Sequence, residues 1–415
     1  MNNIQAKLER LMALGNLMTE LKDTDVLMEN ILTEARKLCA CDAGSIYIRE
    51  GNELSFQFAQ NDTQQRDLPV GKKLIYSTYR MPINEKSIAG YAASHNVVLN
   101  IPDVYQIGDD VPYSFNSSYD LKTGYRTGSI LSVPLRTSSA KIVGVLQLIN
   151  AMDPSGQVVP FDPEDLPIIK HFANMAAVAL ERAEMTRAII LRMIGMAELR
   201  DPTETGAHVN RVGAYSAELY EAWALKHQVA PDEIQRKKDL LRIAAMLHDV
   251  GKVGIPDAIL KKPGGLTDEE FDVIKTHPVI GARLFIDPNS ELDTISRDIA
   301  LCHHERWDGS ERGYPGYVDI DSGAPLPEYL QPNGKPQKRS AEEIPLWARI
   351  VSIADVYDAL SCHRSYKEPW TQDQVFDELQ KSSGSQFDPE LVEIFVARRE
   401  EMQAIRARYP DLHSE

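Results

Sequence analysis

The stretch LLRIAAMLHDVG, residues 240–251, decides the architecture of the second half of the chain. Its apolar residues recur at helical spacing and lead directly into His248 and Asp249, so this pair is expected at the end of a core helix. A histidine and a carboxylate that are removed from water need a partner that neutralises and saturates them. The stretch therefore predicts a helical domain with a charged site at one end of its core.

A second pair of histidines opens the stretch HHERWDGSERGYP, residues 303–315. Adjacent side chains on a helix point about 100° apart, so such a pair alone also fits a solvated helix end. The metal-binding interpretation needs further ligands. His277 lies in KTHPVIG, where Pro278 can open the next helix. Asp355 lies in the apolar helix IVSIADVYDALS, where an isolated carboxylate is costly unless it binds a cation.

The candidate metal ligands are imidazoles and carboxylates: His208, His248, Asp249, His277, His303, His304 and Asp355, with Glu204 as a further member. Such donors without a thiolate suit Fe or Mn, with Zn or Ni as alternatives. The set is too large for one ion, so we expect two or three divalent ions with a carboxylate as bridge. Neighbouring ions of this kind activate a water and stabilise both oxygens of an in-line displacement at phosphorus.

Composition limits the class of protein. A chain of 415 residues suggests two or three domains. The net charge of −16 argues against a binder of nucleic-acid polymers or anionic membranes. The four cysteines form no CxxC pattern, the N-terminal stretch lacks the features of a signal peptide, and no run of 18 apolar residues occurs. We therefore expect a cytoplasmic protein.

The periodicity changes along the chain and predicts two domains. Residues 3–22 and 25–39 have the pattern of amphipathic helices, and the period then falls to about two. The expected strands are 43–50, 52–60, 95–101, 129–137 and 141–151. These elements predict an α+β domain over 1–162, with an antiparallel sheet and flanking helices. Strand signals vanish from residue 201, which predicts an all-α domain over 201–400 and a C-terminal tail over 401–415.

A long helix is expected over 163–200, between the two domains. Its apolar residues fit a heptad, with Leu166, Ala173, Leu180 and Ile194 at position a and Ile169, Ala176, Ala183, Ile190 and Ala197 at position d. One interpretation is a closing helix of the first domain that leads into the next. We favour a signalling helix that pairs with a second copy in a parallel coiled coil, and thus a homodimer through 163–200.

The first domain resembles a GAF domain. The resemblance rests on CDAGSIYI (41–48), FAQNDT (58–63), SVPLR (132–136) and GVLQLIN (144–150). It implies a sensory or dimerising module that regulates the domain after it.

The second domain resembles the HD-GYP subgroup of the HD metal-dependent phosphohydrolases. The motifs are HDVGK (248–252), HHERWDG (303–309), GYP (313–315) and IADVYDALSCHRSYK (353–367). The resemblance implies hydrolysis of cyclic di-GMP to pGpG or onward to GMP, and some members of the subgroup prefer 3′,3′-cGAMP. Matching by motif implies the metal ligands named above, with Asp249 and Lys252 as catalytic residues.

The same resemblance implies that Lys252, Arg364 and Lys367 contact substrate phosphate. An acidic chain has to supply such cations locally for a dianionic ring. Glu204 precedes His208 by four residues, a spacing that puts both on one helix face. Members of the subgroup with a glutamate there resemble the trinuclear kind, which implies a third ion. The alternative for Glu204 is a solvated acid near a helix start.

The chain departs from the subgroup pattern around GYP. Glu311 and Arg312 are additional residues in DGSERGYP, and residues 316–341 form a long insert rich in Pro, Gly and polar residues. Ring specificity and any protein partner at the GYP loop are expected to depend on them. Two rival functions remain: a weakly catalytic protein that binds a cyclic dinucleotide and signals to a partner, and a phosphohydrolase acting on another nucleotide.

Overall fold

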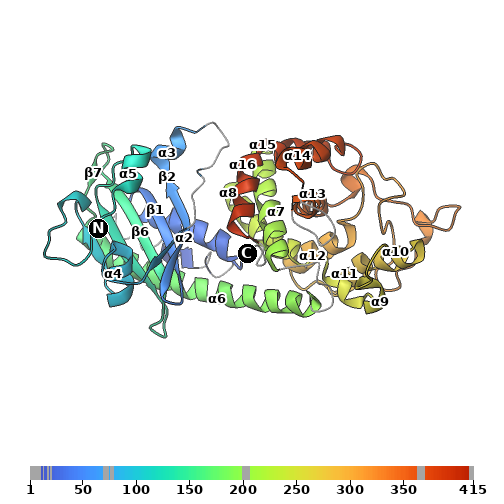
Figure 1. Cartoon of the computed structure of the whole chain (residues 1–415), viewed down its shortest axis with the longest axis horizontal. Coiled ribbons are helices and arrows are strands. Elements are labelled where there is room, and N and C mark those ends of the chain that lie inside the picture. Colours follow the sequence, from blue (N-terminus) through green and yellow to red (C-terminus); the bar gives the residue numbers. More distant parts are fainter. Residues whose placement is uncertain are drawn as a thin grey trace. The chain divides into compact units, whose positions relative to one another are not determined.

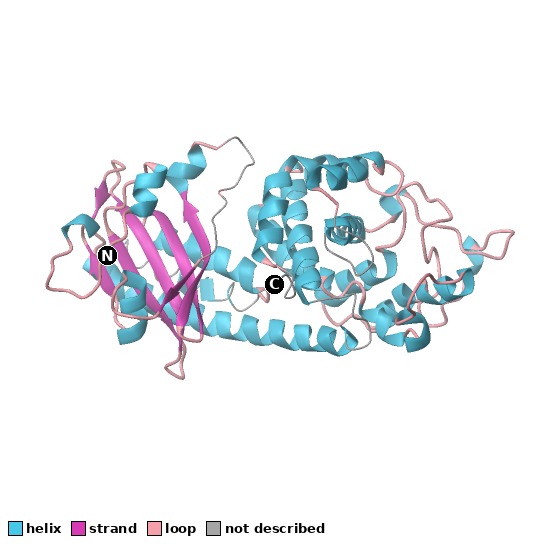
Figure 2. Cartoon of the chain, in the orientation of Figure 1, coloured by secondary structure: helices cyan, strands magenta, loops and turns pink. Residues whose placement is uncertain are grey.

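The computed structural model describes residues 11–12, 14–15, 18, 21–68, 74, 79–198, 206–361 and 370–410, without the side chains of 196–198. The chain divides into two compact units, Met1–Arg187 and Ala188–Glu415. Figure 1 labels their elements and Figure 2 colours them by type, with the strands confined to the first unit. The helix expected over 3–22 lies largely outside the described residues.

The first unit contains an antiparallel sheet with the order β3-β2-β1-β6-β5-β4, and β7 pairs with β6. Helices cover both faces of the sheet, so the central strands are buried along most of their length. The α+β class is confirmed. The strands are β1 Cys41–Glu50, β2 Glu53–Asn61, β3 Arg80–Pro82, β4 Leu99–Ile101, β5 Ile130–Arg136, β6 Ile142–Met152 and β7 Val158–Val159.

Two sets of helices cover the sheet. On one face Ile46 and Leu146 pack with α2 (Thr24–Leu38) and α6 (Leu166–Glu198), and on the other Val145 packs with α4 (Ile88–His95). Asp23 caps α2, because its carboxylate accepts hydrogen bonds from two backbone N–H groups of the first turn. Two shorter helices are α3 (Asp62–Arg66) and α5 (Ser118–Thr123). The strand expected over 95–101 is wrong at its start, because His95 still belongs to α4.

The interpretation of the α6 heptad as a seam between two chains is wrong for most of its length. The a and d residues Ile169, Ala173, Ala176, Leu180 and Ala183 are buried in the hydrophobic core of the first unit itself. Ile194, further along, is buried against Val209 and Met246 in the second unit. The a and d residues of this heptad therefore pack against other parts of the same chain and not against a second copy. The side chain of Ala197 lies outside the described part.

The second unit is helical, as predicted. Helix α7 packs on α8 and α13, and α12 packs on the same two helices, so four helices enclose a common core. Tyr215, Tyr357 and Phe395 are completely buried in it. The helices are α7 Gly206–Lys226, α8 Pro231–Ala245, α9 Asp257–Leu260, α10 Asp268–Ile274, α11 His277–Arg283, α12 Glu291–Cys302, α13 Leu346–Ser361, α14 Gln372–Lys381, α15 Pro389–Ala397 and α16 Arg399–Arg408.

The helical unit extends beyond the expected boundary at residue 400. Helix α16 continues to Arg408, and Met402 is fully buried in the core. Residues 401–408 are therefore part of the packed unit and not a tail.

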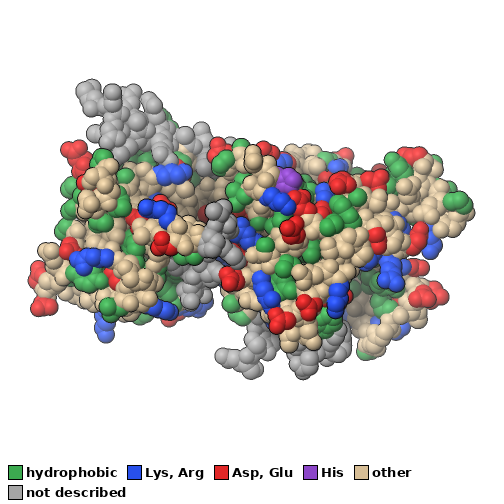
Figure 3. Space-filling view, turned by 90° about the horizontal axis from the view of Figure 1, so that it is seen from above, with side chains coloured by type: hydrophobic (Ala, Val, Ile, Leu, Met, Phe, Trp, Pro, Cys, Tyr) green, Lys and Arg blue, Asp and Glu red, His purple; other side chains and the backbone are tan. Residues whose placement is uncertain are grey.

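The surface mixes both signs of charge. On the face drawn in Figure 3, acidic and basic side chains alternate over the described surface. Within the described ranges, no helix combines the length and the apolar character needed to cross a bilayer.

Candidate metal centre

Five helices or helix ends of the second unit bring the predicted ligands together. His208 lies on α7, His248 and Asp249 lie in the turn after α8, and His277 is the first residue of α11. His303 and His304 follow α12, and Asp355 lies on α13. Asp249, His277, His303 and His304 form one group, and His208, His248 and Asp355 form another. In each group, one potential ligand atom per residue lies within 4.8 Å of the others.

The first group is built around one oxygen of Asp249. His277 Nε2 lies 3.0 Å from Asp249 Oδ1, and His303 Nε2 lies 3.5 Å from the same oxygen. The two imidazole nitrogens are 3.5 Å apart. Both histidine side chains are about 1% exposed or less, so the solvated helix end considered for His303 is wrong.

The second group faces the other oxygen of Asp249. His248 Nε2 lies 3.3 Å from Asp249 Oδ2 and 3.9 Å from Asp355 Oδ1, and His208 Nε2 lies 3.7 Å from that Asp355 oxygen. Asp249 thus has one carboxylate oxygen toward each group. This is the geometry of a bridging carboxylate between two cation sites.

The backbone determines which nitrogen carries the proton in three of these histidines. His248 Nδ1 lies 2.8 Å from the Ala245 carbonyl and His277 Nδ1 lies 2.8 Å from that of Ile274. His303 Nδ1 lies 3.0 Å from the Ile299 carbonyl. Carbonyl oxygens only accept, so each Nδ1 donates, and each Nε2 presents its lone pair to the site.

Two such lone pairs face each other between His277 and His303, across 3.5 Å. Neutral imidazoles in these tautomers cannot form a hydrogen bond there, because neither Nε2 has a proton to donate. The buried Oδ1 of Asp249 also makes no hydrogen bond. A divalent cation would satisfy all three atoms at once, so the donor set fits a metal ion.

Protonation of the site also suits metal ligation. Burial lowers the pKa of His303, and burial together with His303 and His277 lowers that of His304 well below its usual value. Burial opposes ionisation of Asp249, but the neighbouring ammonium of Lys252 holds the pKa of this carboxyl well below its usual range. Neutral imidazoles and an ionised carboxylate are the forms that bind metal ions.

Gly251 allows the segment that carries Asp249 to approach the helix that begins at His277. A Cβ atom at this position would lie 2.0 Å from the His277 carbonyl oxygen and 2.4 Å from the Gly281 nitrogen. The 3₁₀ helix η3 (Val250–Gly254) therefore packs backbone to backbone against α11. Its close approach holds Asp249 beside His277.

One predicted phosphate-binding residue lies beside the cluster. Lys252 Nζ is 2.7 Å from Asp249 Oδ2, and its side chain keeps 22% of its surface exposed, so the ammonium borders both the ligands and solvent. Arg364, Lys367 and Glu204 lie outside the described residues.

The GYP segment directly contacts the segment that carries His303 and His304. The Tyr314 ring stacks on His304, with centroids 4.6 Å apart. The fully buried carboxylate of Glu305 accepts a hydrogen bond of 2.6 Å from the Gly316 nitrogen, and Arg339, at the end of the insert, also donates to it. Both ends of the insert are thereby attached to the residue that follows the two histidines.

The sequence analysis missed the residues that support His208. Its Nδ1 lies 2.8 Å from Asp358 Oδ2, and Arg211 donates two hydrogen bonds to the same carboxylate. Burial opposes ionisation of Asp358, but the hydrogen bonds from His208 and Arg211 lower its pKa. The signal in the sequence was the spacing of Asp355 and Asp358 in DVYD, which puts both on one face of a core helix.

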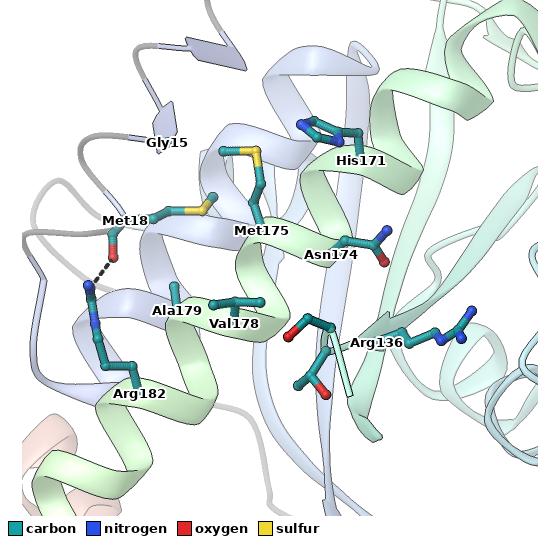
Figure 4. Close-up of a pocket in the computed structure, with 11 residues that line it drawn as sticks. Gly15, Met18, Arg136, His171, Asn174, Met175, Val178, Ala179 and Arg182 are labelled. Carbon is teal, nitrogen blue, oxygen red and sulfur yellow. Dashed lines mark hydrogen bonds between the residues drawn. The ribbon is translucent and has the colours of Figure 1, made fainter. Parts of the chain in front are cut away.

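A cavity of about 540 Å³ lies in the first unit, beside α6 (Figure 4). Met18, Met175, Val178 and Ala179 give it an apolar wall. Arg182 donates a hydrogen bond of 2.9 Å to the Met18 carbonyl, drawn as a dashed line in Figure 4. These contacts specify no ligand chemistry.

Family comparisons agree with this division of the chain. Residues 23–180 match the model of the GAF domain and residues 205–360 match that of the HD domain. The chain therefore carries a GAF domain followed by an HD domain, as the motifs indicated.

Three curated relatives are named as cyclic-dinucleotide phosphodiesterases. The chain is 37% identical over 228 residues to the 3′3′-cGAMP-specific phosphodiesterase 2 of Vibrio cholerae serotype O1, covering 55% of this chain and 38% of that protein. It is 40% identical over 227 residues to a cyclic di-GMP phosphodiesterase of the same organism, covering 54% and 41%. A cyclic di-GMP phosphodiesterase of Thermotoga maritima is 37% identical over 223 residues, covering 54% and 52%. The chain spans about half or less of the length of these relatives.

Proposed function

We propose that the chain is a metal-dependent phosphodiesterase of the HD-GYP type that hydrolyses a cyclic dinucleotide under the control of its GAF domain. The observation that carries the proposal is the pair of opposed groups of Nε2 atoms and carboxylate oxygens, with Asp249 between them. The names of the relatives support the substrate class. The donor set supports iron or manganese, with zinc or nickel as alternatives.

Each group of residues would hold one divalent ion, and Asp249 would bridge the two. When bound, such ions supply the Lewis acidity that hydrolysis of a phosphodiester requires. Lys252 places a cation beside Asp249 and would neutralise charge that develops on a phosphate oxygen. Arg364 and Lys367 are proposed to contact the phosphates of the ring.

Cyclic di-GMP is the proposed substrate, with 3′,3′-cGAMP as the second candidate because one relative carries that name. The test is to incubate iron- or manganese-loaded protein with each ring and to separate the products by chromatography. We expect pGpG or GMP from cyclic di-GMP. Binding of the ring without turnover would favour a signalling receptor, and hydrolysis of an unrelated nucleotide alone would overturn the substrate class.

Glu204 is proposed to serve a third ion together with His208, the member of the second group that lies on α7. Elemental analysis after anaerobic purification should then show up to three metals per chain, and Glu204→Ala should lose about one of them. Glu218→Ala, on the same helix and away from the predicted ligands, is the control that should keep all ions. If the wild-type protein never exceeds two metals and Glu204→Ala binds as many, Glu204 is only an acid near a helix start.

The dimer remains a proposal, but it needs a different face of α6. Val178, Met185, Ile189 and Met193 are 48%, 63%, 50% and 55% exposed. At 100° per residue they fall within about 80° of arc, so they form one apolar stripe along the helix. A stripe with heptad-like spacing can pair with the same stripe of a second copy, which is the partner we propose.

Met185→Lys combined with Ile189→Lys should therefore convert a dimer into a monomer in analytical ultracentrifugation. Leu121→Lys is the control, because Leu121 is 84% exposed on α5 and lies outside the stripe. A dimer of unchanged strength in the double variant would exclude this face. We also propose that the protein acts in the cytoplasm, with the exposed part of the 316–341 insert as the surface for a protein partner.

A further inference from the structure

We propose that Asp358, held by the guanidinium of Arg211, is a positioning residue that fixes His208 in the orientation needed for metal ligation. The inference rests on the proposed metal centre. Asp358 and Arg211 would touch neither ion nor substrate. They would instead determine how tightly the second group, His208, His248 and Asp355, binds its ion.

The contacts of Asp358 are specific to His208. Its Oδ2 lies 2.8 Å from His208 Nδ1, and a carboxylate can only accept, so Nδ1 carries the proton. His208 Nε2 then presents its lone pair on the side of Asp355, whose Oδ1 lies 3.7 Å away. The other buried histidines of the centre use backbone carbonyls for this purpose. His208 is held by a side chain instead, so its orientation depends on what holds Asp358.

Arg211 holds Asp358 through a two-pronged contact. Its Nε donates to Asp358 Oδ1 at 2.6 Å and its Nη2 donates to Oδ2 at 2.9 Å. Both side chains are almost completely buried, at 2% and 1% exposed. Since a planar guanidinium matches the two oxygens of a carboxylate, this pair fixes the rotation of Asp358 as well as its position.

The far end of Arg211 reaches the C-terminal helix. Its Nη1 donates to the Tyr409 carbonyl at 2.9 Å, and the Tyr409 hydroxyl accepts a hydrogen bond from Arg242. A continuous set of hydrogen bonds therefore runs from the end of α16 through Arg211 and Asp358 to His208. The residues beyond 400 thus contribute a contact to this set, because the Tyr409 carbonyl accepts from the arginine that holds the carboxylate.

A purely structural role for the Arg211–Asp358 pair would not involve the metal. Buried ion pairs are often no more stabilising than apolar contacts of the same volume. A carboxylate that accepts from a metal-ligating histidine raises its basicity and fixes its tautomer, and losing it typically weakens metal binding about 10–100-fold. The two roles therefore predict different results for metal affinity.

The test is a chelator-competition titration of manganese with Asp358→Asn, which keeps the shape of the side chain. We expect the ions that use His208 to bind about 10–100-fold more weakly, while the ion of the Asp249, His277, His303 and His304 group is retained. In the His208→Ala background, Asp358→Asn should cause no further loss, because the interaction that it removes is already absent.

Glu221→Gln is the matched control. Glu221 forms a buried ion pair with Lys238 on α8, and it lies 13 residues after His208 on α7, about 20 Å along the helix axis. It should lower the melting temperature without changing metal affinity. If Asp358→Asn does not fold, Arg211→Lys makes the same test, since lysine keeps the charge but cannot grip both oxygens.

The outcomes are distinct. Wild-type protein that binds none of manganese, iron, zinc and nickel would remove the proposed centre and this inference with it. Wild-type protein that binds manganese, with a folded Asp358→Asn or Arg211→Lys variant of equal affinity, would overturn the positioning role and leave the proposed function intact. Equal additional losses in the wild-type and His208→Ala backgrounds would show that Asp358 acts through general stability.

Discussion

Asp249→Ala should abolish hydrolysis and reduce the metal content of the purified protein. Asp249 directs one carboxylate oxygen to each group of histidines, so its removal takes an oxygen from both groups at once. A metal ion contributes several kcal/mol of transition-state stabilisation, and about 1.4 kcal/mol is a factor of ten in rate. The turnover of cyclic di-GMP should therefore fall on the order of 10³-fold or more. His303→Ala should have a similar effect, because it removes one of the two opposed Nε2 atoms.

The measurement combines elemental analysis, product chromatography and circular dichroism. His227→Ala is the matched control: this histidine lies in the same helical unit, but it is exposed, stacks on Trp223 and pairs with Glu390. It should keep full metal content and activity. Normal metal content and normal turnover in a folded Asp249→Ala protein would refute the assignment of the centre.

Lys252→Ala should keep the metals and lose turnover. Its ammonium lies 2.7 Å from Asp249 Oδ2, where it competes with a cation for that oxygen, so its removal does not take away a ligand. The substitution does remove the ammonium of Lys252, which lies between the candidate ligands and solvent. Loss of one preorganised charge or donor at a reacting centre costs on the order of 10²–10³-fold in turnover.

The metal content of Lys252→Ala decides how the loss is interpreted. Lys261→Ala is the control, because Lys261 pairs with Asp257 on the exposed helix α9 and should not affect turnover. A Lys252→Ala protein that loses its metals would show that the lysine supports the ligands. A Lys252→Ala protein that hydrolyses the substrate at the wild-type rate would show that other groups neutralise the charge on the substrate phosphate.

Much of the candidate ligand set could be predicted from the sequence because these residues stand out against their local context. His248 and Asp249 end an apolar stretch, and Asp355 interrupts an apolar helix, so their cost of burial is visible without coordinates. The grouping of the ligands was not visible in this way. Which oxygen of Asp249 faces which histidine depends on the packing of α11 and α12 against η3, which Gly251 permits through its missing side chain.

The heptad of α6 illustrates the opposite case. Its period correctly predicted a helix with one apolar face, but a period does not identify the partner that covers that face. The first unit's own sheet and the helix α2 cover it, which leaves a different stripe exposed. Which surface covers an apolar helix face depends on the tertiary packing, so the covering surface cannot be derived from residue spacing alone.

The sequence by itself determined the two domain classes, the candidate ligands and the kind of metal chemistry they support. These properties follow from residue type and local periodicity, which do not depend on distant contacts. Only the tertiary structure decided that Asp358 lies against His208 and Arg211, which precede it by 150 and 147 residues in the chain. The spacing in DVYD puts Asp358 on the same helix face as Asp355, but it does not identify the partners of Asp358. Those partners follow from the packing of α7 against α13 and from the contact of Arg211 with Tyr409.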